Sequence, residues 1–252
     1  MLLAVDIGNT NTVFGFFRKK ELLASFRTTT GHAQTADECG VLIKQFLDLE
    51  KFTKLDGITV ATVVPRLEPV YRQMATDYYQ LEPLFVDSSV KLNITFDYPT
   101  PAEVGADRIC NAAAAYDRFG GPTIVVDFGT ATTFDIISGG GAYVGGVIAP
   151  GIETALSTLA HRAAQLFKVS FEKPAQVIGK STEEAMKSGF YLGAVGQTDH
   201  IIDSIAAEMP TKPRVIATGG LAPAIAPQSK HISEIRPDIT LQGMRLIYEL
   251  NR

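Results

Sequence analysis

The sequence predicts an α/β protein made of two similar halves, each opening with strands and continuing with helices. An apolar run that ends in aspartate and is followed by glycine and small polar residues occurs twice. After each copy the apolar spacing changes from that of strands to that of helices. The two turns align without a gap, DIGNTNT over 6–12 and DFGTATT over 127–133. This favours a duplication over a chance likeness of two hairpins.

The first half reads as three strands followed by helices and one further strand. Strands are predicted over 2–7, 12–17 and 22–28, separated by polar turns, as in an antiparallel meander. Thr35 and Glu38 have the spacing of a capping box, which predicts a helix from that point. A strand over 57–64 ends before Pro65, and helices are expected over 70–81 and 104–116.

The second half repeats this order. Strands are predicted over 123–127, 134–137 and 142–148, with a hairpin turn at 138–141. A helix follows over 152–167, and a second capping box at 181–184 opens a long helix to about residue 209. A strand over 214–217 and a helix over 241–250 complete the chain. We place the boundary between the lobes at residues 117 and 118.

Composition limits the classes of partner. The chain has 252 residues, 46% of them hydrophobic, and a net charge of −4. Its longest basic run is three residues, which argues against a nucleic acid or a membrane surface as partner. We expect no signal peptide, because no basic region precedes a long apolar stretch at the start of the sequence, and no apolar segment is long enough to span a bilayer. Cys39 and Cys110 lack metal-ligand spacing. We therefore expect a cytoplasmic protein with reduced thiols.

The paired turns suit the binding of phosphate. Gly8 and Gly129 allow the backbone to approach a ligand closely, and amide and hydroxyl groups beside them can cradle phosphate oxygens. Asp6 and Asp127 supply hard oxygen ligands for cations. One such turn is weak evidence, because hairpins often contain these residues, whereas two matching turns at the start of two similar halves are much stronger evidence for a phosphate site. The predicted strand over 214–217 leads into a turn at Gly219 and Gly220. This turn could contact adenine or ribose, or it could be an ordinary turn between a strand and a helix.

The segment 98–108 contains a charged pair at the start of a predicted helix. Pro99, Pro101 and Gly105 shape a loop before Asp107 and Arg108. A kinase that acts on a hydroxyl group needs a carboxylate to accept its proton, and an arginine can bind a carboxylate or phosphate with two donors. From the residues alone, a helix start with a surface ion pair is the favoured interpretation.

Five motifs, in order along nearly the whole chain, carry a resemblance to a known family. They are DIGNTNT (6–12), PAEVGADR (101–108), VDFGTATTFD (126–135), GGVIAPG (145–151) and ATGG (217–220). The paired turns resemble those of the actin, hexokinase and heat-shock ATPase superfamily, and the whole set resembles type III pantothenate kinases. The resemblance implies two ribonuclease H-like lobes of β-β-β-α-β-α type that face an ATP cleft. It also implies transfer of the γ-phosphate of ATP to pantothenate, the first step of coenzyme A synthesis.

The resemblance further assigns roles to residues. Asp107 becomes the catalytic base. It implies a monovalent cation, potassium or ammonium, at Asp127, and a divalent cation such as Mg²⁺ near Asp6. The pantothenate pocket is implied at Tyr98, Gly105, Ala106, Asp107, Arg108 and Thr182. ATP contacts are implied at Asp6, Ile7, Gly8, Asn9, Thr10, Asn11, Thr12, Val13 and Thr130.

A homodimer is expected for a related reason. The helix opened at 181–184 is apolar on more than one face and rich in small residues, whereas a surface helix of a monomer shows one apolar stripe. Burial inside the second lobe would explain this equally well. The resemblance to type III pantothenate kinases, which form dimers with the pocket near the subunit boundary, favours the dimer.

Two other functions compete with this one. The first is another enzyme of the superfamily, such as a sugar kinase or a phosphatase acting on polyphosphate. A sugar site would show more polar side chains than the loop 98–108 offers. The second is a non-catalytic nucleotide-binding regulator, for which no basic recognition helix is present. The four histidines are scattered, and none is expected to be catalytic.

Overall fold

The structure, a computed structural model, describes residues 1–31, 33–162 and 169–252. Packing divides it into two units, Met1–Arg118 with Asp238–Arg252, and Phe119–Pro237. The end of the first segment lies within one residue of the predicted lobe boundary. The C-terminal segment, expected in the second lobe, packs with the first unit instead, because its helix α7 (Ile239–Leu250) lies against β1 and β4.

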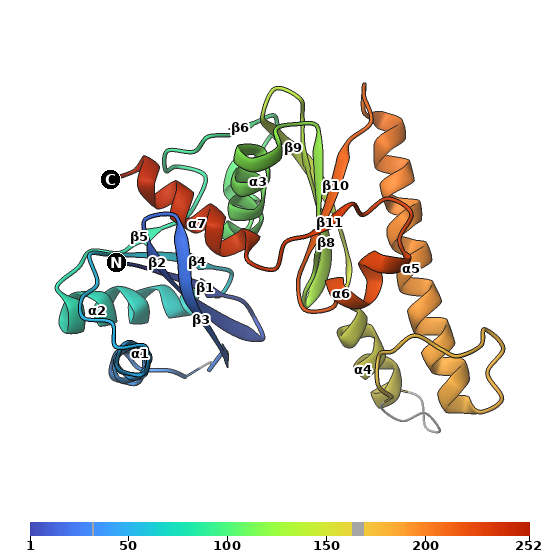
Figure 1. Cartoon of the computed structure of the whole chain (residues 1–252), viewed down its shortest axis with the longest axis horizontal. Coiled ribbons are helices and arrows are strands. Elements are labelled where there is room, and N and C mark those ends of the chain that lie inside the picture. Colours follow the sequence, from blue (N-terminus) through green and yellow to red (C-terminus); the bar gives the residue numbers. More distant parts are fainter. Residues whose placement is uncertain (32, 163–168) are drawn as a thin grey trace. The chain divides into compact units, whose positions relative to one another are not determined.

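The first unit has a five-stranded sheet in the order β3-β2-β1-β4-β5 (Figure 1). Strands β1 and β2 pair antiparallel, and β1 and β4 pair parallel. The elements of this unit, besides α7, are β1 (Leu2–Ile7), β2 (Asn11–Arg18), β3 (Glu21–Thr29), α1 (Ala36–Leu49), β4 (Gly57–Thr62), α2 (Glu68–Tyr79), β5 (Leu84–Phe85), β6 (Thr95–Phe96) and α3 (Ala106–Phe119), with short 3₁₀ turns at Pro65–Leu67 and Pro101–Glu103.

Helices α1 and α2 cover one face of this sheet. Alternate residues of β1, including Leu3, Val5 and Ile7, enter a core with side chains of both helices, as the period of a strand requires. The predicted capping box of α1 is confirmed. The Glu38 N–H donates to Thr35 Oγ1 at 3.2 Å, and the Thr35 N–H donates to Glu38 Oε2 at 2.8 Å.

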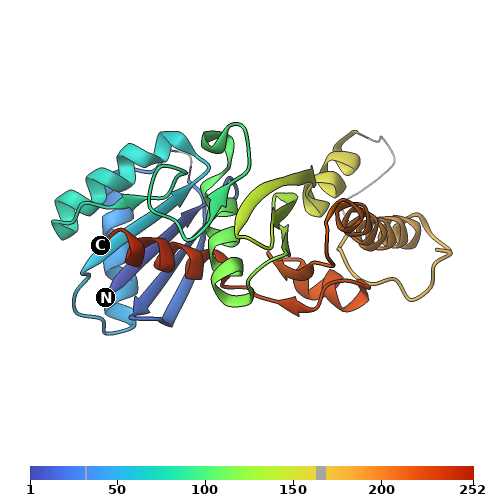
Figure 2. The same cartoon turned by 90° about the horizontal axis from the view of Figure 1, so that it is seen from above.

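Helix α7 covers the other face, where Asp6 and Val13 also lie (Figures 1 and 2). Glycines allow this close approach. A Cβ added to Gly15 would lie 2.9 Å from Leu241, and one added to Gly243 would lie 2.0 Å from the Cys110 carbonyl oxygen. Both distances are below van der Waals contact, so α7 packs directly on the strands and on α3.

The second unit repeats the sheet of the first. Its strands follow the order β11-β10-β7-β8-β9, which matches β5-β4-β1-β2-β3 strand for strand and in direction. The predicted duplication is therefore confirmed. The elements are β7 (Thr123–Phe128), β8 (Ala131–Ile137), β9 (Ala142–Pro150), α4 (Ile152–Arg162), α5 (Thr182–Glu208), β10 (Arg214–Thr218), α6 (Ala222–Ile225), a 3₁₀ turn at Ala226–Gln228, and β11 (Glu234–Ile235).

The gapless alignment of the two turns is wrong by one residue after the glycine. Ile7 pairs with Thr12, whereas its counterpart Phe128 pairs with Thr132. Two residues separate Gly8 from its partner Asn11, but only Thr130 separates Gly129 from Ala131. Thr12 therefore matches Thr132, and both are buried. Thr132 thus faces the core, and its hydroxyl group is not available to a phosphate. This differs from the expectation that the hydroxyl groups beside Gly129 bind phosphate.

The long helix α5 starts as predicted, with a different partner for its acidic residue. The Glu184 N–H donates to Ser181 Oγ at 3.2 Å, but Glu184 Oε2 accepts from the Lys180 N–H at 2.6 Å rather than from Ser181. The expected helix over 152–167 is described as α4 over Ile152–Arg162, and its remaining part, residues 163–168, lies outside the described residues. Within the described residues, no helix is long and apolar enough to cross a membrane.

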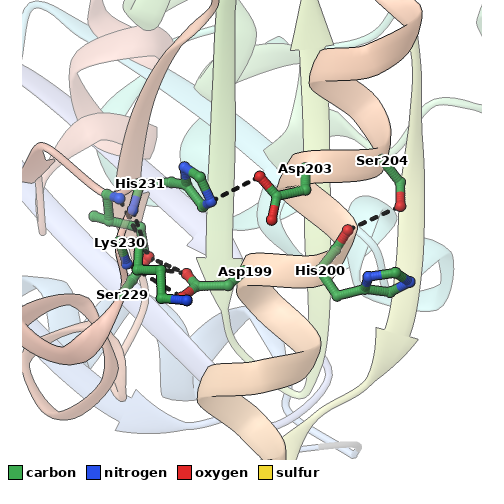
Figure 3. A network of polar contacts seen from close by, with 8 residues as sticks. Asp199, His200, Asp203, Ser204, Ser229, Lys230 and His231 are labelled. Carbon is green, nitrogen blue, oxygen red and sulfur yellow. Dashed lines mark hydrogen bonds and ion pairs between the residues drawn. The ribbon is translucent and has the colours of Figure 1, made fainter.

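A polar network joins α5 to the loop before β11 (Figure 3). Asp199 Oδ1 accepts a hydrogen bond from Ser229 Oγ at 2.6 Å, and His231 Nε2 lies 3.0 Å from Asp203 Oδ1. Ser229 Oγ in turn accepts from the backbone N–H of His231 at 3.2 Å. These contacts fix the loop against α5 and so place the edge strand β11.

Candidate active site

The first turn connects β1 to β2 and is held by hydrogen bonds to its own backbone and to Thr30. The Gly8 N–H donates to the Asn11 carbonyl at 3.0 Å, and the Thr30 N–H donates to the Thr10 carbonyl at 2.9 Å. Asn9 and Thr10 are exposed, so the tip of the turn is accessible to a ligand.

The residues predicted to contact ATP lie on opposite faces of the sheet. Ile7 and Thr12 are fully buried and face the α1 and α2 side of the sheet. Only their backbone groups could reach a nucleotide. Asp6 and Val13, which pair across β1 and β2, lie half-buried on the opposite face. A ligand at this turn would therefore lie on the face of the sheet that carries Asp6.

Asp6 and Asp107 both lie in the neighbourhood of the Cys110 thiol. Burial raises the pKa of Cys110 well above its ordinary value, and the negative charges of Asp6 and Asp107 raise it further. Asp6 ends β1, and Asp107 lies in the first turn of α3, one helical turn before Cys110. The fold of the first unit thus brings together the two carboxylates that the sequence assigned to cation binding and to base catalysis.

The pKa of the Asp107 carboxyl group is shifted by its surroundings. Burial raises the pKa of its carboxyl group, while a hydrogen bond from the Arg108 N–H, at 2.8 Å from Oδ1, and the Arg108 charge lower it. A raised pKa brings an aspartate closer to neutral pH, where a base works best. A Cβ on Gly105 would lie 2.6 Å from Asp107 Oδ1, so glycine at this position leaves room for the carboxylate.

Among the remaining residues of the predicted pocket, Tyr98, Gly105, Ala106 and Arg108 belong to the first unit and Thr182 to the second. Ala106 is the first residue of α3 and is buried. Tyr98, Gly105 and Arg108 are half-buried. Thr182 lies in the second unit, where it is the exposed first residue of α5. It borders an apolar groove of about 470 Å³, lined by Leu159, Thr182, Ala185, Met186, Gly189 and Phe190.

The second turn, between β7 and β8, is packed against glycine backbone. Gly219 follows β10 with φ of +89°, and a Cβ there would lie 2.5 Å from Asp127 Oδ1 and 2.6 Å from the Phe128 backbone. Gly151 follows β9, and a Cβ there would lie 2.1 Å from the Thr130 carbonyl oxygen. The Gly-Gly turn and the GGVIAPG motif therefore meet at the turn that carries Asp127 and Thr130.

The carboxylates of the two turns suit cations that are bound by phosphate oxygens of a ligand as well as by the protein. Among the described residues, no group of three or more histidine, cysteine, aspartate or glutamate side chains could hold a metal ion. Mg²⁺ in kinases is commonly bound by one or two carboxylates together with phosphate oxygens. Asp6 alone, at the end of β1, fits that pattern. Asp127, beside backbone carbonyl groups of the turn, fits a cation with oxygen ligands.

The structure also gives the positions and contacts of several other polar residues. Asp135 is fully buried and accepts from the Tyr143 hydroxyl at 3.0 Å, while Glu153 is exposed in the first turn of α4. His231 contacts Asp203 in the network of Figure 3, and His200 lies on α5. His32 is outside the described residues. Thr30 and Cys110 were not singled out from the sequence, because neither belongs to a pattern and both matter only through contacts made by folding.

Comparison with known proteins decides among the superfamily's members. The family described as type III pantothenate kinase matches residues 2–204. The chain belongs to the type III pantothenate kinase family. It is 45% identical to the type III pantothenate kinase of Anaeromyxobacter sp. (strain K) and 44% identical to that of Roseiflexus sp. (strain RS-1), with all of both chains covered in each case.

Superposition on solved structures supports the assignment of the fold but not of the function. The Arthrobacter sp. strain KM inorganic polyphosphate/ATP-glucomannokinase superposes with a TM-score of 0.51 at 15% identity, covering 100% of this chain and 99% of that one. The activator of 2-hydroxyisocaproyl-CoA dehydratase from Clostridium difficile, with bound ADPNP, gives 0.53 at 10% identity, with 98% and 93% covered. This type III pantothenate kinase family member thus has the fold of the actin- and hexokinase-like ATPases.

Proposed function

We propose that this protein is a pantothenate kinase that transfers the γ-phosphate of ATP to pantothenate and yields ADP and 4′-phosphopantothenate. Family membership over the full chain carries this conclusion. The observation that supports it in the structure is the meeting of Asp6 and Asp107 around Cys110. A phosphate turn and a half-buried carboxylate in one neighbourhood suit transfer to an alcohol.

Asp107 is proposed as the base. Its carboxylate accepts the proton of the pantothenate hydroxyl group as that oxygen bonds to the γ-phosphorus atom. The bond from this phosphorus atom to the bridging oxygen breaks, and ADP leaves with the electron pair. The raised pKa of Asp107 supports this role. Arg108, next in the chain, is proposed to bind the negative charge of pantothenate, and Tyr98, Gly105 and Ala106 are proposed to line the same pocket.

ATP is proposed to lie along the first turn, on the face that carries Asp6, and to contact Thr130 in the second turn. The exposure of Asn9 and Thr10 supports phosphate binding there. A divalent cation near Asp6 would neutralise phosphate charge, and potassium or ammonium at Asp127 would add to this. The single carboxylate at the end of each first strand supports both assignments.

A homodimer is proposed as the working unit. Ala185, Gly189, Leu192, Gly193 and Gly196 form an exposed stripe along α5, and a Cβ added to any of the three glycines would meet nothing within 4 Å. Small residues in such a stripe allow a second helix to approach closely. Thr182 of the partner subunit would then complete the pantothenate pocket.

The test is a phosphoryl-transfer assay with purified protein, ATP and a panel of acceptors. Pantothenate is expected to be phosphorylated far faster than glucose or mannose, with one ADP formed for each phosphopantothenate. Preference for a sugar would favour another kinase of the superfamily. ATP binding without transfer to any acceptor would favour a nucleotide-binding regulator and would contradict the proposal.

A further inference from the structure

Thr30 lies directly after β3 and contacts the first turn three times. Its N–H donates to the Thr10 carbonyl at 2.9 Å, and its hydroxyl group donates to the Gly8 carbonyl at 2.7 Å. The same hydroxyl oxygen lies 3.0 Å from Thr12 Oγ1. Since the only hydroxyl hydrogen of Thr30 is used on Gly8, the Thr12 hydroxyl is the donor in that pair. Thr30 is 8% exposed, so these bonds are shielded from water.

These bonds fix which way the turn's peptide groups point. The C=O and the following N–H of a trans peptide point in opposite directions. Thr12 and Thr30 lie on the α1 and α2 side of the sheet, so a Gly8 carbonyl held there turns the Asn9 N–H toward the face of Asp6. The carbonyl oxygens of Gly8, Thr10 and Asn11 all accept bonds within the protein. None of them is then turned toward a phosphate, which it would repel.

Buried side chains behind Thr30 make this support rigid. Tyr71 of α2 is fully buried beside Thr12 and Cys39. Burial raises the pKa of its phenol, the Cys39 thiol raises it further, and the Thr12 hydroxyl lowers it. The Tyr71 hydroxyl oxygen has no hydrogen-bond partner among the described residues, so the polar support consists of the bonds that link Thr12, Thr30 and the Gly8 carbonyl. These buried groups hold one geometry, because each loses a partner when another moves.

We propose that Thr30 is a positioning residue for nucleotide binding: its hydroxyl group holds the turn 8–11 in the form that presents backbone N–H groups to the phosphates of ATP. This inference rests on the proposed function only in naming ATP as the ligand. The role is absent from the second turn. Strand pairing makes Gly151 the counterpart of Thr30, and there Thr154 donates to the Thr130 carbonyl at 2.9 Å instead.

The experiment measures ATP affinity by calorimetry, without any acceptor, for the wild type, Thr30→Val and Thr30→Ser. Valine keeps the shape of threonine but not its hydroxyl group, so affinity should fall about tenfold, the usual cost of leaving a buried acceptor unsatisfied. Serine should restore affinity to within about twofold. Thr28→Val is the matched control, since Thr28 Oγ1 has no hydrogen-bond partner among the described residues, and should bind ATP as the wild type does.

Kinetics separate a positioning role from a general loss of fold. Thr30→Val should raise the KM for ATP while the KM for pantothenate and the melting temperature of the nucleotide-free protein change little. Wild-type ATP affinity in a folded Thr30→Val protein would overturn the inference. If that variant does not fold, Thr30→Cys, whose thiol is a weaker donor, should bind ATP at an intermediate level, and unchanged affinity there would overturn it. A wild type that binds ATP but phosphorylates no acceptor would contradict the proposed function and leave this test intact.

Discussion

The two units have the same strand order but hold their turns by different means. After the third strand the first unit has Thr30 and the second has Gly151. At the end of the fourth strand the first unit has Thr62, the last residue of β4, opposite Ile7, and the second has Gly219, directly after β10 and packed on Phe128. The first turn is held by the N–H and hydroxyl groups of Thr30. The second has one side-chain bond, from Thr154 to the Thr130 carbonyl, and backbone that lies directly on backbone at Gly151 and Gly219. The first should therefore fail when a hydroxyl group is removed, and the second when a methyl group is added.

The second turn should be broken by Gly219→Ala. The new Cβ would lie 2.5 Å from Asp127 Oδ1, at a φ of +89° that alanine adopts poorly. We expect a loss of about 2 to 4 kcal/mol in the free energy of unfolding, measured by urea titration. Gly220→Ala is the control, because a Cβ there meets nothing within 4 Å. Equal stability of the two variants would show that the second turn is not held by this contact.

The exposed stripe of α5 distinguishes the second unit in another way. Gly193→Arg places a long charged side chain on the stripe, so the mass from light scattering should fall from dimer to monomer and the activity should fall with it. Gly140→Arg makes the same change in an open hairpin turn and should leave the dimer intact. A monomeric variant with full activity would refute the shared site, as would a wild type that is monomeric at assay concentration and active.

The carboxylates of the two turns should differ in the cation they serve. Replacing sodium by potassium at constant ionic strength should raise the rate of the wild type. Asp127→Ala should abolish this response, because the oxygen ligands at the second turn are lost, while the need for a divalent ion persists. The rates are compared in a coupled ADP assay. Equal rates in sodium and potassium for the wild type would contradict a monovalent cation site at Asp127.

The pH dependence should come from the first unit. Burial raises the pKa of Asp107, and the base works only when deprotonated. The kcat/KM for pantothenate should therefore fall on acidification at a pH above about 4, the ordinary aspartate range. Arg108→Gln should move this limb to still higher pH, since the Arg108 charge lowers the Asp107 pKa. A limb at the ordinary aspartate value in both proteins would argue against Asp107.

Much of this arrangement could be predicted from the sequence, because the signals are local. The capping residue Thr35, the strand β1 and the turn glycines each follow from a few neighbouring residues. The one-residue difference between the turns could not be predicted, since the gapless alignment keeps Asp, Gly and Thr in place. The two-residue strands β5 and β11 are too short to show a period. The position of Cys110 between Asp6 and Asp107 depends on packing between distant segments.

The measurement that tests the central claim most directly is phosphoryl transfer to pantothenate by Asp107→Asn. Asparagine keeps the shape of aspartate but cannot take the proton, so we expect turnover to fall about a hundredfold or more. ATP affinity should be unchanged. The melting temperature should be no lower than that of the wild type, because a carboxylate that burial disfavours is removed. An Asp107→Asn protein with near-normal turnover would contradict the assignment of the base and the mechanism built on it.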